Sequence, residues 1–478
     1  MLFNSIDFII FLPIVFILYW FVANKNLKIQ NLLVVAASYL FYGWWDWRFL
    51  SLILFSTIVD FIVGQKLRNE HDQLKRKVLL WVSIIVNLGF LGFFKYYNFF
   101  LDNFVNAFSF FGQEIQGNSL NIILPVGISF YTFQTLSYTI DVYKRKLEPT
   151  KDFIGFSAFV SFFPQLVAGP IERATNLLPQ FTQERKFSNK KAIDGLHLIL
   201  WGLFKKVVIA DSSAIYVNEI FSKYETMNSL TLILGAIYFA FQIYCDFSGY
   251  SDIAVGTSKL FGIDLMRNFN FPYFSRDIAE FWRRWHISLS TWFRDYLYIP
   301  LGGSRGVKRN KIRNVFIIFT VSGFWHGANW TFIFWGFLNA VYFLPLFLTN
   351  NNRNHLNIIA KGKNFPSISE FFQMLLTFTL VVLAWIFFRA DSVSIAFKYI
   401  ANIFSFNFNG GLQYLSIERY APELSILILL FIILEWNSRE REHPFFGKWI
   451  SLKLSLIILS LITLGVYYDI TDFIYFQF

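Results

Sequence analysis

A histidine in the middle of an apolar stretch is the feature of this sequence that most directly suggests chemistry. His326 lies in the segment SGFWHGANW, residues 322–330, with apolar runs before it at 315–320 and after it at 332–348. An imidazole at membrane depth loses hydration, which favours its neutral, proton-accepting form. Such a group suits general-base chemistry on a hydroxyl. The alternative is a packing histidine that is hydrogen-bonded to a neighbouring helix.

A second histidine, His286, lies in a segment that is too charged to span a membrane and too aromatic for a solvated loop. This segment, DIAEFWRRWHISLSTWFRDY, covers residues 277–296. Its tryptophans and arginines are typical of a helix at the membrane interface. Two interpretations remain open. The helix binds anionic lipid head groups, or it lines the mouth of a polar cavity into which His286 points.

Apolar helices must position these residues. Of the 478 residues, 55% are hydrophobic and only 15% are charged, whereas a soluble domain carries about 25% charged residues. Apolar runs recur from end to end, which predicts an all-α polytopic membrane protein with about eleven transmembrane helices in a single domain, 1–478. The candidate spans, some of which are too short to cross alone, are 7–23, 31–46, 49–65, 78–95, 122–142, 193–210, 230–250, 313–324, 331–349, 369–388, 424–436 and 452–468.

Two places in the chain predict broken helices inside the membrane region. The apolar stretch 153–170 contains prolines and is expected to be re-entrant, because a bilayer tolerates broken backbone only where protein covers it. Small residues flank His326, with Gly323 before it and Gly327 after it, and they favour a break or a close helix approach there. We therefore expect His326 near mid-depth, where both sides of the membrane can reach it.

The charges predict how the chain is threaded through the membrane. The net charge is +11, and the basic residues collect in short loops, including 66–77, 305–313 and 437–453, rather than in a nucleic-acid-binding face. The positive-inside rule places these loops in the cytoplasm and both termini outside. The single cysteine, Cys245, and the spacing of the six histidines predict no metal site.

Five sequence blocks, in order, resemble the membrane-bound O-acyltransferase superfamily, and specifically its bacterial alginate O-acetyltransferase branch. They are LPVGISFYTFQ at 124–134, FPQLVAGPI at 163–171, QIYCDFSGYSD at 242–252, the block 282–305, and FWHGA at 324–328. The resemblance implies re-entrant and interfacial helices and a ring of tilted spans around a central tunnel. It also implies that His326 and His286 are the catalytic positions. Cys245 stands where an aromatic residue is expected in this branch.

The resemblance also implies a function. The chain would move an acetyl group from a cytoplasmic thioester donor, acetyl-CoA or an acylated carrier, through the inner membrane of a bacterium for O-acetylation of an exported, alginate-like polysaccharide. An SGNH-type partner would act outside the membrane. No bound cofactor is needed because a thioester is already activated. His326 would be the general base, and His286 would orient substrate or stabilise the oxyanion. Alternatives are peptidoglycan O-acetylation, D-alanyl transfer to teichoic acid, and a transporter or flippase without transfer chemistry.

Further residues are candidates for the tunnel and for a relay. Trp325, Asn329 and Trp285 are expected to line the tunnel. Asp246, a carboxylate in an apolar helix, is expected either to hydrogen-bond a neighbouring helix or to line the tunnel as well. Near the C-terminus, Tyr475 is a hypothetical acyl relay that would accept acetyl and present it to the external partner. The alternative for this aromatic segment is an interfacial belt.

Overall fold

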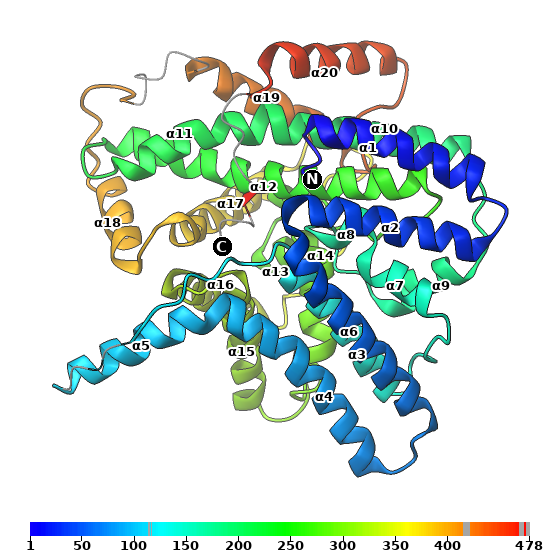
Figure 1. Ribbon diagram of the computed structural model, residues 1–478. Coiled ribbons are helices and arrows are strands. Elements are labelled where there is room, and N and C mark those ends of the chain that lie inside the picture. The colour runs from blue at the N-terminus through cyan, green and yellow to red at the C-terminus, as the bar shows by residue number, and fades with distance from the viewer. Residues whose placement is uncertain (113–114, 116, 414–420, 468–472, 475–478) are drawn as a thin grey trace. The chain divides into compact units, whose positions relative to one another are not determined.

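The computed structural model describes residues 1–112, 115, 117–413, 421–467 and 473–474, and the described part of the chain is helical with no strand (Figure 1). It forms two compact units. Unit 1 comprises 1–195 and 254–266, and unit 2 comprises 196–253 and 267–478. Two of the three unit boundaries fall inside helices, α10 (Asn189–Leu203) and α12 (Ser229–Leu260), and the third lies between residues 266 and 267, before η5. The single domain predicted from sequence stays a prediction.

Unit 1 contains the N-terminal helices. They follow the predicted apolar runs closely as far as residue 95. The elements are α1 (Ile6–Ile17), η1 (Leu18–Val22), α2 (Leu27–Asp46), η2 (Trp47–Phe49), α3 (Leu50–Asn69), α4 (Gln73–Leu91), η3 (Gly92–Tyr96), α5 (Tyr97–Phe110), α6 (Ile128–Tyr143), α7 (Phe153–Ser161), α8 (Phe163–Leu166) and α9 (Ala174–Thr182).

A buried carboxylate joins three of these helices. Asp60 of α3 accepts hydrogen bonds from Ser83 and Asn87 of α4, the latter at 2.9 Å, and from Thr139 of α6 at 3.0 Å. Figure 1 shows the three helices side by side. Because lipid is as apolar as leucine, interhelical hydrogen bonds of this kind specify which apolar helices associate.

The predicted span 122–142 is wrong at its start. The helix α6 begins only at Ile128, because Gly127 has a left-handed backbone with φ 74°. A Cβ at this position would lie 2.8 Å from the carbonyl oxygen of Leu166. The predicted break within 153–170 is confirmed, since α7 ends at Ser161 and α8 starts at Phe163. Protein covers this break, because Phe162 and Phe163 are both fully buried.

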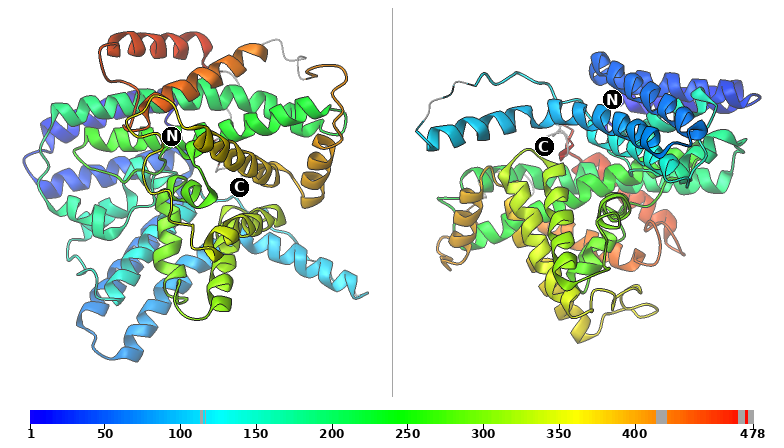
Figure 2. Two further views of the ribbon diagram at one scale, coloured as in Figure 1. Left: turned by 180° about the vertical axis from the view of Figure 1, so that it is seen from behind. Right: turned by 90° about the horizontal axis from the view of Figure 1, so that it is seen from below.

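The helix α5 was missed by the sequence analysis, which ended the preceding span at residue 95. The chain after α5 runs back along it (Figure 2, cyan). Asn98 holds this return, because its side chain donates to the Leu120 carbonyl at 2.8 Å and accepts from the Leu120 N–H at 3.0 Å.

Unit 2 contains the predicted catalytic segments. Its elements beyond its shares of α10 and α12 are η4 (Phe204–Ala210), α11 (Asp211–Ser222), η5 (Pro272–Phe274), α13 (Ile278–Arg284), α14 (Ile287–Phe293), η6 (Arg294–Tyr298), α15 (Lys308–His326), α16 (Trp330–Leu348), α17 (Ile368–Arg389), α18 (Val393–Ile403), α19 (Ala421–Ser438) and α20 (Ile450–Leu464). The helix α18 was not predicted.

The helices α15 and α16 form a tight hairpin that carries His326 at its turn (Figure 2, yellow-green). Two glycines allow the backbones to touch. A Cβ at Gly323 would lie 2.2 Å from the carbonyl oxygen of Phe332, and one at Gly336 would lie 2.3 Å from that of Phe319. The predicted helix break beside His326 is therefore confirmed, and the close approach has the small residues that membrane helices use for it.

The helices fit a membrane protein by length and composition. Among the described residues, five helical segments are long and apolar enough to cross a membrane, and three shorter apolar helices accompany them. The predicted all-α polytopic membrane class is confirmed, while the number of about eleven crossings stays a prediction. The five long segments are Leu27–Asn69, Gln73–Phe110, Ser229–Leu260, Trp330–Leu348 and Ile368–Arg389.

Candidate active site

The imidazole of His326 lies in an aromatic enclosure. It is the last residue of α15, and only 3% of its surface is exposed. Its ring centroid lies 5.0 Å from that of Trp325, 5.2 Å from that of Trp335 and 5.3 Å from that of Phe388. The C-terminal end of a helix favours a positive charge, so a proton taken up by His326 meets a favourable dipole within a site from which water is largely excluded.

His286 occupies a strained joint between two short helices. The predicted single interfacial helix over 277–296 is wrong, because α13 ends at Arg284 and α14 begins at Ile287. His286 has a left-handed backbone, φ 42°, which costs a side-chain-bearing residue about 1–2 kcal/mol. Trp285 and Trp292 of the same segment are buried in protein, so they are not interfacial anchors.

Asn268 fixes the tautomer of His286. The Asn268 Oδ1 atom accepts hydrogen bonds from the N–H of Ser288 at 3.2 Å and from its Oγ at 2.9 Å, which identifies this atom as the amide oxygen. His286 Nδ1 lies 3.1 Å from the same oxygen and must therefore carry the proton. Burial lowers the pKa of His286 to about 3. The neutral ring thus presents the lone pair of Nε2, which can accept a hydrogen bond or a proton.

One indole connects the two histidines. The Trp325 ring lies 5.9 Å from the His286 ring and 5.0 Å from the His326 ring. The structure therefore brings together two predicted catalytic residues that lie forty positions apart in the sequence. Trp325 belongs to this site by contact with both rings.

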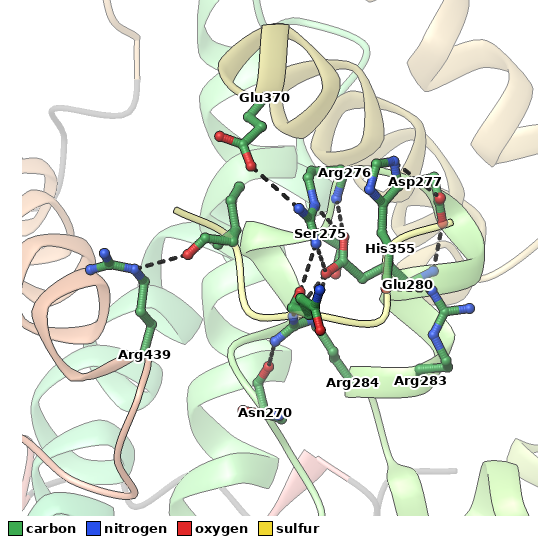
Figure 3. Close-up of polar contacts among 12 residues, drawn as sticks. Asn270, Ser275, Arg276, Asp277, Glu280, Arg283, Arg284, His355, Glu370 and Arg439 are labelled. Atoms are coloured by element: carbon green, nitrogen blue, oxygen red, sulfur yellow. Dashed lines mark hydrogen bonds and ion pairs between the residues drawn. The ribbon is translucent and has the colours of Figure 1, made fainter. Parts of the chain in front are cut away.

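A cluster of ion pairs anchors α13 and, through it, the joint at His286 (Figure 3). Glu280 pairs with Arg276 at 3.0 Å and with Arg284 at 2.8 Å, and Arg276 also pairs with Glu370 of α17 at 3.3 Å. Burial alone would raise the pKa of the Glu280 carboxyl, but the hydrogen bonds and charges of the two arginines bring that pKa below its usual value. The carboxylate is therefore ionised and stabilises a structure that carries the buried Arg284 and the half-buried Arg276.

Arginine side chains also bind the polar segment 350–367 to unit 2 (Figure 3). Arg283 donates to the backbone carbonyls of Asn352 at 2.7 Å and His355 at 2.8 Å. Arg439, just after α19, donates to the carbonyl of Ala360 at 2.9 Å. The segments after α16 and after α19 therefore meet on one side of the unit.

A cavity of about 440 Å³ is lined by residues that neighbour the two histidines, although neither imidazole lines it. Ile287, next to His286, and Ser322, one helical turn before His326, both line it. Trp282 lines it as well, and its ring lies 5.6 Å from Trp335, which in turn contacts His326. The cavity combines apolar walls, such as Phe343, with hydroxyls and basic groups. The polar lining residues are Arg283, Ser290, Thr291, Arg294, Tyr298, Ser304, Ser322, Asn352 and Arg353.

The other predicted site residues have different surroundings. Asn329 caps α16 by accepting from the Thr331 N–H at 2.9 Å. Trp285 packs against Trp385 with ring centroids 5.0 Å apart. Asp246 is buried and pairs with Lys206 at 2.9 Å. Tyr475 lies outside the described residues.

Asn268 and Glu280 were both missed by the sequence analysis. Glu280 had a local signal, because arginines stand four residues before it and four residues after it. Asn268 had none, because its contact with His286 depends on how the chain folds between them. Among the described residues, no group of three or more His, Cys, Asp or Glu side chains is placed to hold a metal ion.

Apolar helices of membrane-spanning length, two buried imidazoles and a nearby cavity are together typical of a membrane-embedded enzyme. The model of the MBOAT, membrane-bound O-acyltransferase, family matches residues 144–382. The chain belongs to this family and is an O-acyltransferase.

Three relatives illustrate the range of similar proteins. The chain is 39% identical over 409 residues to the probable alginate O-acetylase AlgI of Azotobacter vinelandii, a match covering 85% of this chain and 78% of the relative. It is 33% identical over 528 residues to the peptidoglycan O-acetyltransferase of Helicobacter pylori, covering 100% and 98%. The teichoic acid D-alanyltransferase of Bacillus subtilis is 30% identical over 236 residues, covering 46% and 58%.

Two substitutions test whether Asn268 positions His286. Asn268→Ala removes the acceptor for Nδ1–H, and we expect kcat/KM for acyl transfer to fall about 10- to 100-fold as the tautomer is lost. Asn268→Asp keeps the acceptor and adds a negative charge. The raised pKa of His286 should then move the acid limb of the pH–rate profile upward, toward neutrality.

The pH profile separates positioning from simple packing. Activity of the aspartate variant with an unchanged acid limb would contradict a role for Asn268 in setting the protonation of His286. Asn270→Ala is the matched control, since Asn270 contacts Arg284 through its backbone and stands in the same segment.

Proposed function

We propose that this O-acyltransferase takes an acetyl group from a cytoplasmic thioester donor and delivers it across the inner membrane for O-acetylation of an exported polysaccharide. The observation that carries the proposal is that two buried imidazoles, those of His286 and His326, both contact the Trp325 indole. A cavity with basic residues in its lining lies close by. The positive-inside rule predicts that both termini lie outside the membrane, where an SGNH-type partner would complete the transfer.

The cavity supports a phosphopantetheine thioester as the donor. Its volume, about 440 Å³, is within the usual range for small-molecule sites. Phe319 and Phe343 offer apolar walls for the pantetheine arm, and Arg294 and Arg353 offer charge for phosphate groups. Acetyl-CoA and an acylated carrier protein share this arm, so either source fits the same chemistry.

The residues present can perform the transfer without a metal ion. An acceptor hydroxyl attacks the thioester carbonyl while His326 takes the hydroxyl proton. The tetrahedral intermediate then collapses, the C–S bond breaks, and the thiolate leaves and recovers the proton from His326. His286, whose Nε2 is an acceptor, suits orientation of the incoming hydroxyl and does not suit donation to the oxyanion.

The acceptor has two candidates. The similarity to alginate O-acetylases favours an alginate-like polymer. The full-length alignment with the Helicobacter pylori protein favours peptidoglycan, because it covers both chains almost completely. D-alanyl transfer has weaker support, since the Bacillus subtilis alignment covers less than half of this chain.

The function and its donor site are tested together with purified protein in proteoliposomes and labelled acetyl-CoA. Wild-type protein should consume the thioester and acquire or pass on the label. Replacing both Arg294 and Arg353 by alanine should raise the KM for acetyl-CoA more than tenfold and leave kcat nearly unchanged, because the phosphate contacts bind donor and transition state alike.

The control for this measurement is Arg305→Ala, which removes a basic residue of the neighbouring loop outside the cavity lining. An unchanged KM in the double variant would refute the cavity as the donor site. Absence of any thioester consumption, with acetyl-CoA and with an acetylated carrier alike, would refute the acyl-transfer proposal itself.

A further inference from the structure

Three of the described residues that follow α20, namely Val466, Phe473 and Ile474, are buried in unit 2. The N–H of Val466 donates to the carbonyl of Val207 at 3.1 Å, and the N–H of Ile474 donates to Asp246 Oδ2 at 2.8 Å. Val466 is 5% exposed, Phe473 1% and Ile474 2%. An aromatic belt facing lipid would expose Phe473, so its burial argues against that interpretation for this residue.

Asp246 links this segment to a buried lysine. Its Oδ1 atom pairs with Lys206 Nζ at 2.9 Å, and Lys206 also pairs with Asp211 at 2.8 Å. All three residues are buried. An ionised carboxylate away from water is costly unless it is paired and hydrogen-bonded, and here one oxygen meets the lysine while the other meets the Ile474 N–H.

Phe473 lies close to the candidate active site. The Phe473 ring lies 4.8 Å from that of Tyr250 and 5.8 Å from that of Phe247. The Phe247 ring lies 4.6 Å from the imidazole of His286. A single aromatic ring therefore separates Phe473 from a catalytic candidate.

We propose that Asp246, paired with Lys206, is a latch that holds residues 473–474 beside the His286 wall. In this role Asp246 is a positioning residue that acts through the backbone of Ile474. The inference deepens the proposed function and rests on it for its purpose, which is to hold these two residues against the wall of the candidate active site.

A neighbouring ion pair separates the latch from ordinary helix association. Lys205 and Asp252 pair at 2.6 Å and join the same two elements, η4 and α12, through side chains alone. Gly202 and Gly249 also bring α10 and α12 into backbone contact, because a Cβ at Gly202 would lie 2.5 Å from the Gly249 carbonyl oxygen. The helices thus have other contacts, and loss of Asp246 should release the segment more than the helices.

The test uses a buried reporter. Ile474→Cys in a Cys245→Ser background puts a thiol at a position whose wild-type residue is 2% exposed, while its backbone N–H is retained. The rate of maleimide labelling of the full-length protein then reports release of the segment. Asp246→Ala removes a hydrogen bond to a charged group and should raise the labelling rate about ten- to a hundredfold, whereas Asp252→Ala should leave it unchanged.

Equal labelling rates in the Asp246→Ala and Asp252→Ala variants would overturn the latch. If the alanine variant does not yield monodisperse protein, Asp246→Asn and Asp252→Asn give the same comparison with a smaller expected rise, because a neutral acceptor bonds less strongly than a charged one. The labelling readout does not depend on catalysis. A released segment with a silent Tyr475→Phe variant would leave the latch standing and remove the relay.

Discussion

Replacement of His326 by alanine is expected to reduce acyl transfer at least about 100-fold while the protein stays folded. The imidazole is 3% exposed, lies at the turn of the α15–α16 hairpin, and contacts Trp325 and Trp335. Its proposed task is to take a hydroxyl proton, and alanine provides no base. The measurement is the initial rate of label transfer from acetyl-CoA, with size-exclusion behaviour and thermal unfolding followed in parallel.

Two further variants interpret this result. His326→Gln keeps a hydrogen-bonding side chain and removes the base, so it should be nearly as inactive as His326→Ala. His71→Ala, at an exposed loop position of unit 1, should transfer acetyl at the wild-type rate. Retention of more than about a tenth of wild-type turnover in His326→Ala would refute general-base catalysis and favour the packing interpretation.

Replacement of Tyr475 by phenylalanine is expected to abolish acetylation of the external acceptor, with a loss of about 100-fold or more, because the proposed nucleophile is removed while the ring remains. Two described residues just before it support this expectation. The Ile474 N–H donates to Asp246, and the Phe473 ring lies 5.8 Å from that of Phe247, which contacts the His286 ring. The measurement is acetyl content of the exported polymer, together with mass spectrometry for an acetyl ester on Tyr475 in the wild type.

Tyr467→Phe is the matched control for this prediction. Tyr467 stands in the same C-terminal region, and its hydroxyl donates to the Leu461 carbonyl at 2.7 Å. Its loss should affect local stability by little and acetylation not at all. Full acetylation in the Tyr475→Phe strain would end the relay hypothesis.

The apolar pattern predicted most of the helices because membrane helices are read from length and hydrophobicity. The break beside His326 was also predictable, since Gly323 and Gly327 are present in the sequence and small residues permit close backbones. The start of α6 was not. Residues 122–127 are apolar, but they end at a left-handed glycine that packs against the Leu166 carbonyl, and this contact is visible only in the fold.

The segment around His286 shows a different limit. Tryptophans beside arginines predict an interfacial helix, but a buried segment has the same composition when its charges find partners inside the protein. Arg284 forms an ion pair with Glu280, and the ring of Trp285 packs against that of Trp385. Asn268 lies eighteen residues before His286, and no periodicity relates them. Both histidines could be predicted as catalytic candidates from the sequence, but the protonation state of His286 could not be predicted.

The left-handed joint at His286 also bears on protein engineering. Glycine adopts that backbone without steric cost, so it would relieve about 1–2 kcal/mol of strain at position 286. The same change would leave a cavity beside Phe247 and Trp325 and would remove the partner of the Asn268 amide. The backbone strain alone therefore does not favour glycine, and a thermostable redesign of this enzyme would keep histidine at position 286 and add stability elsewhere.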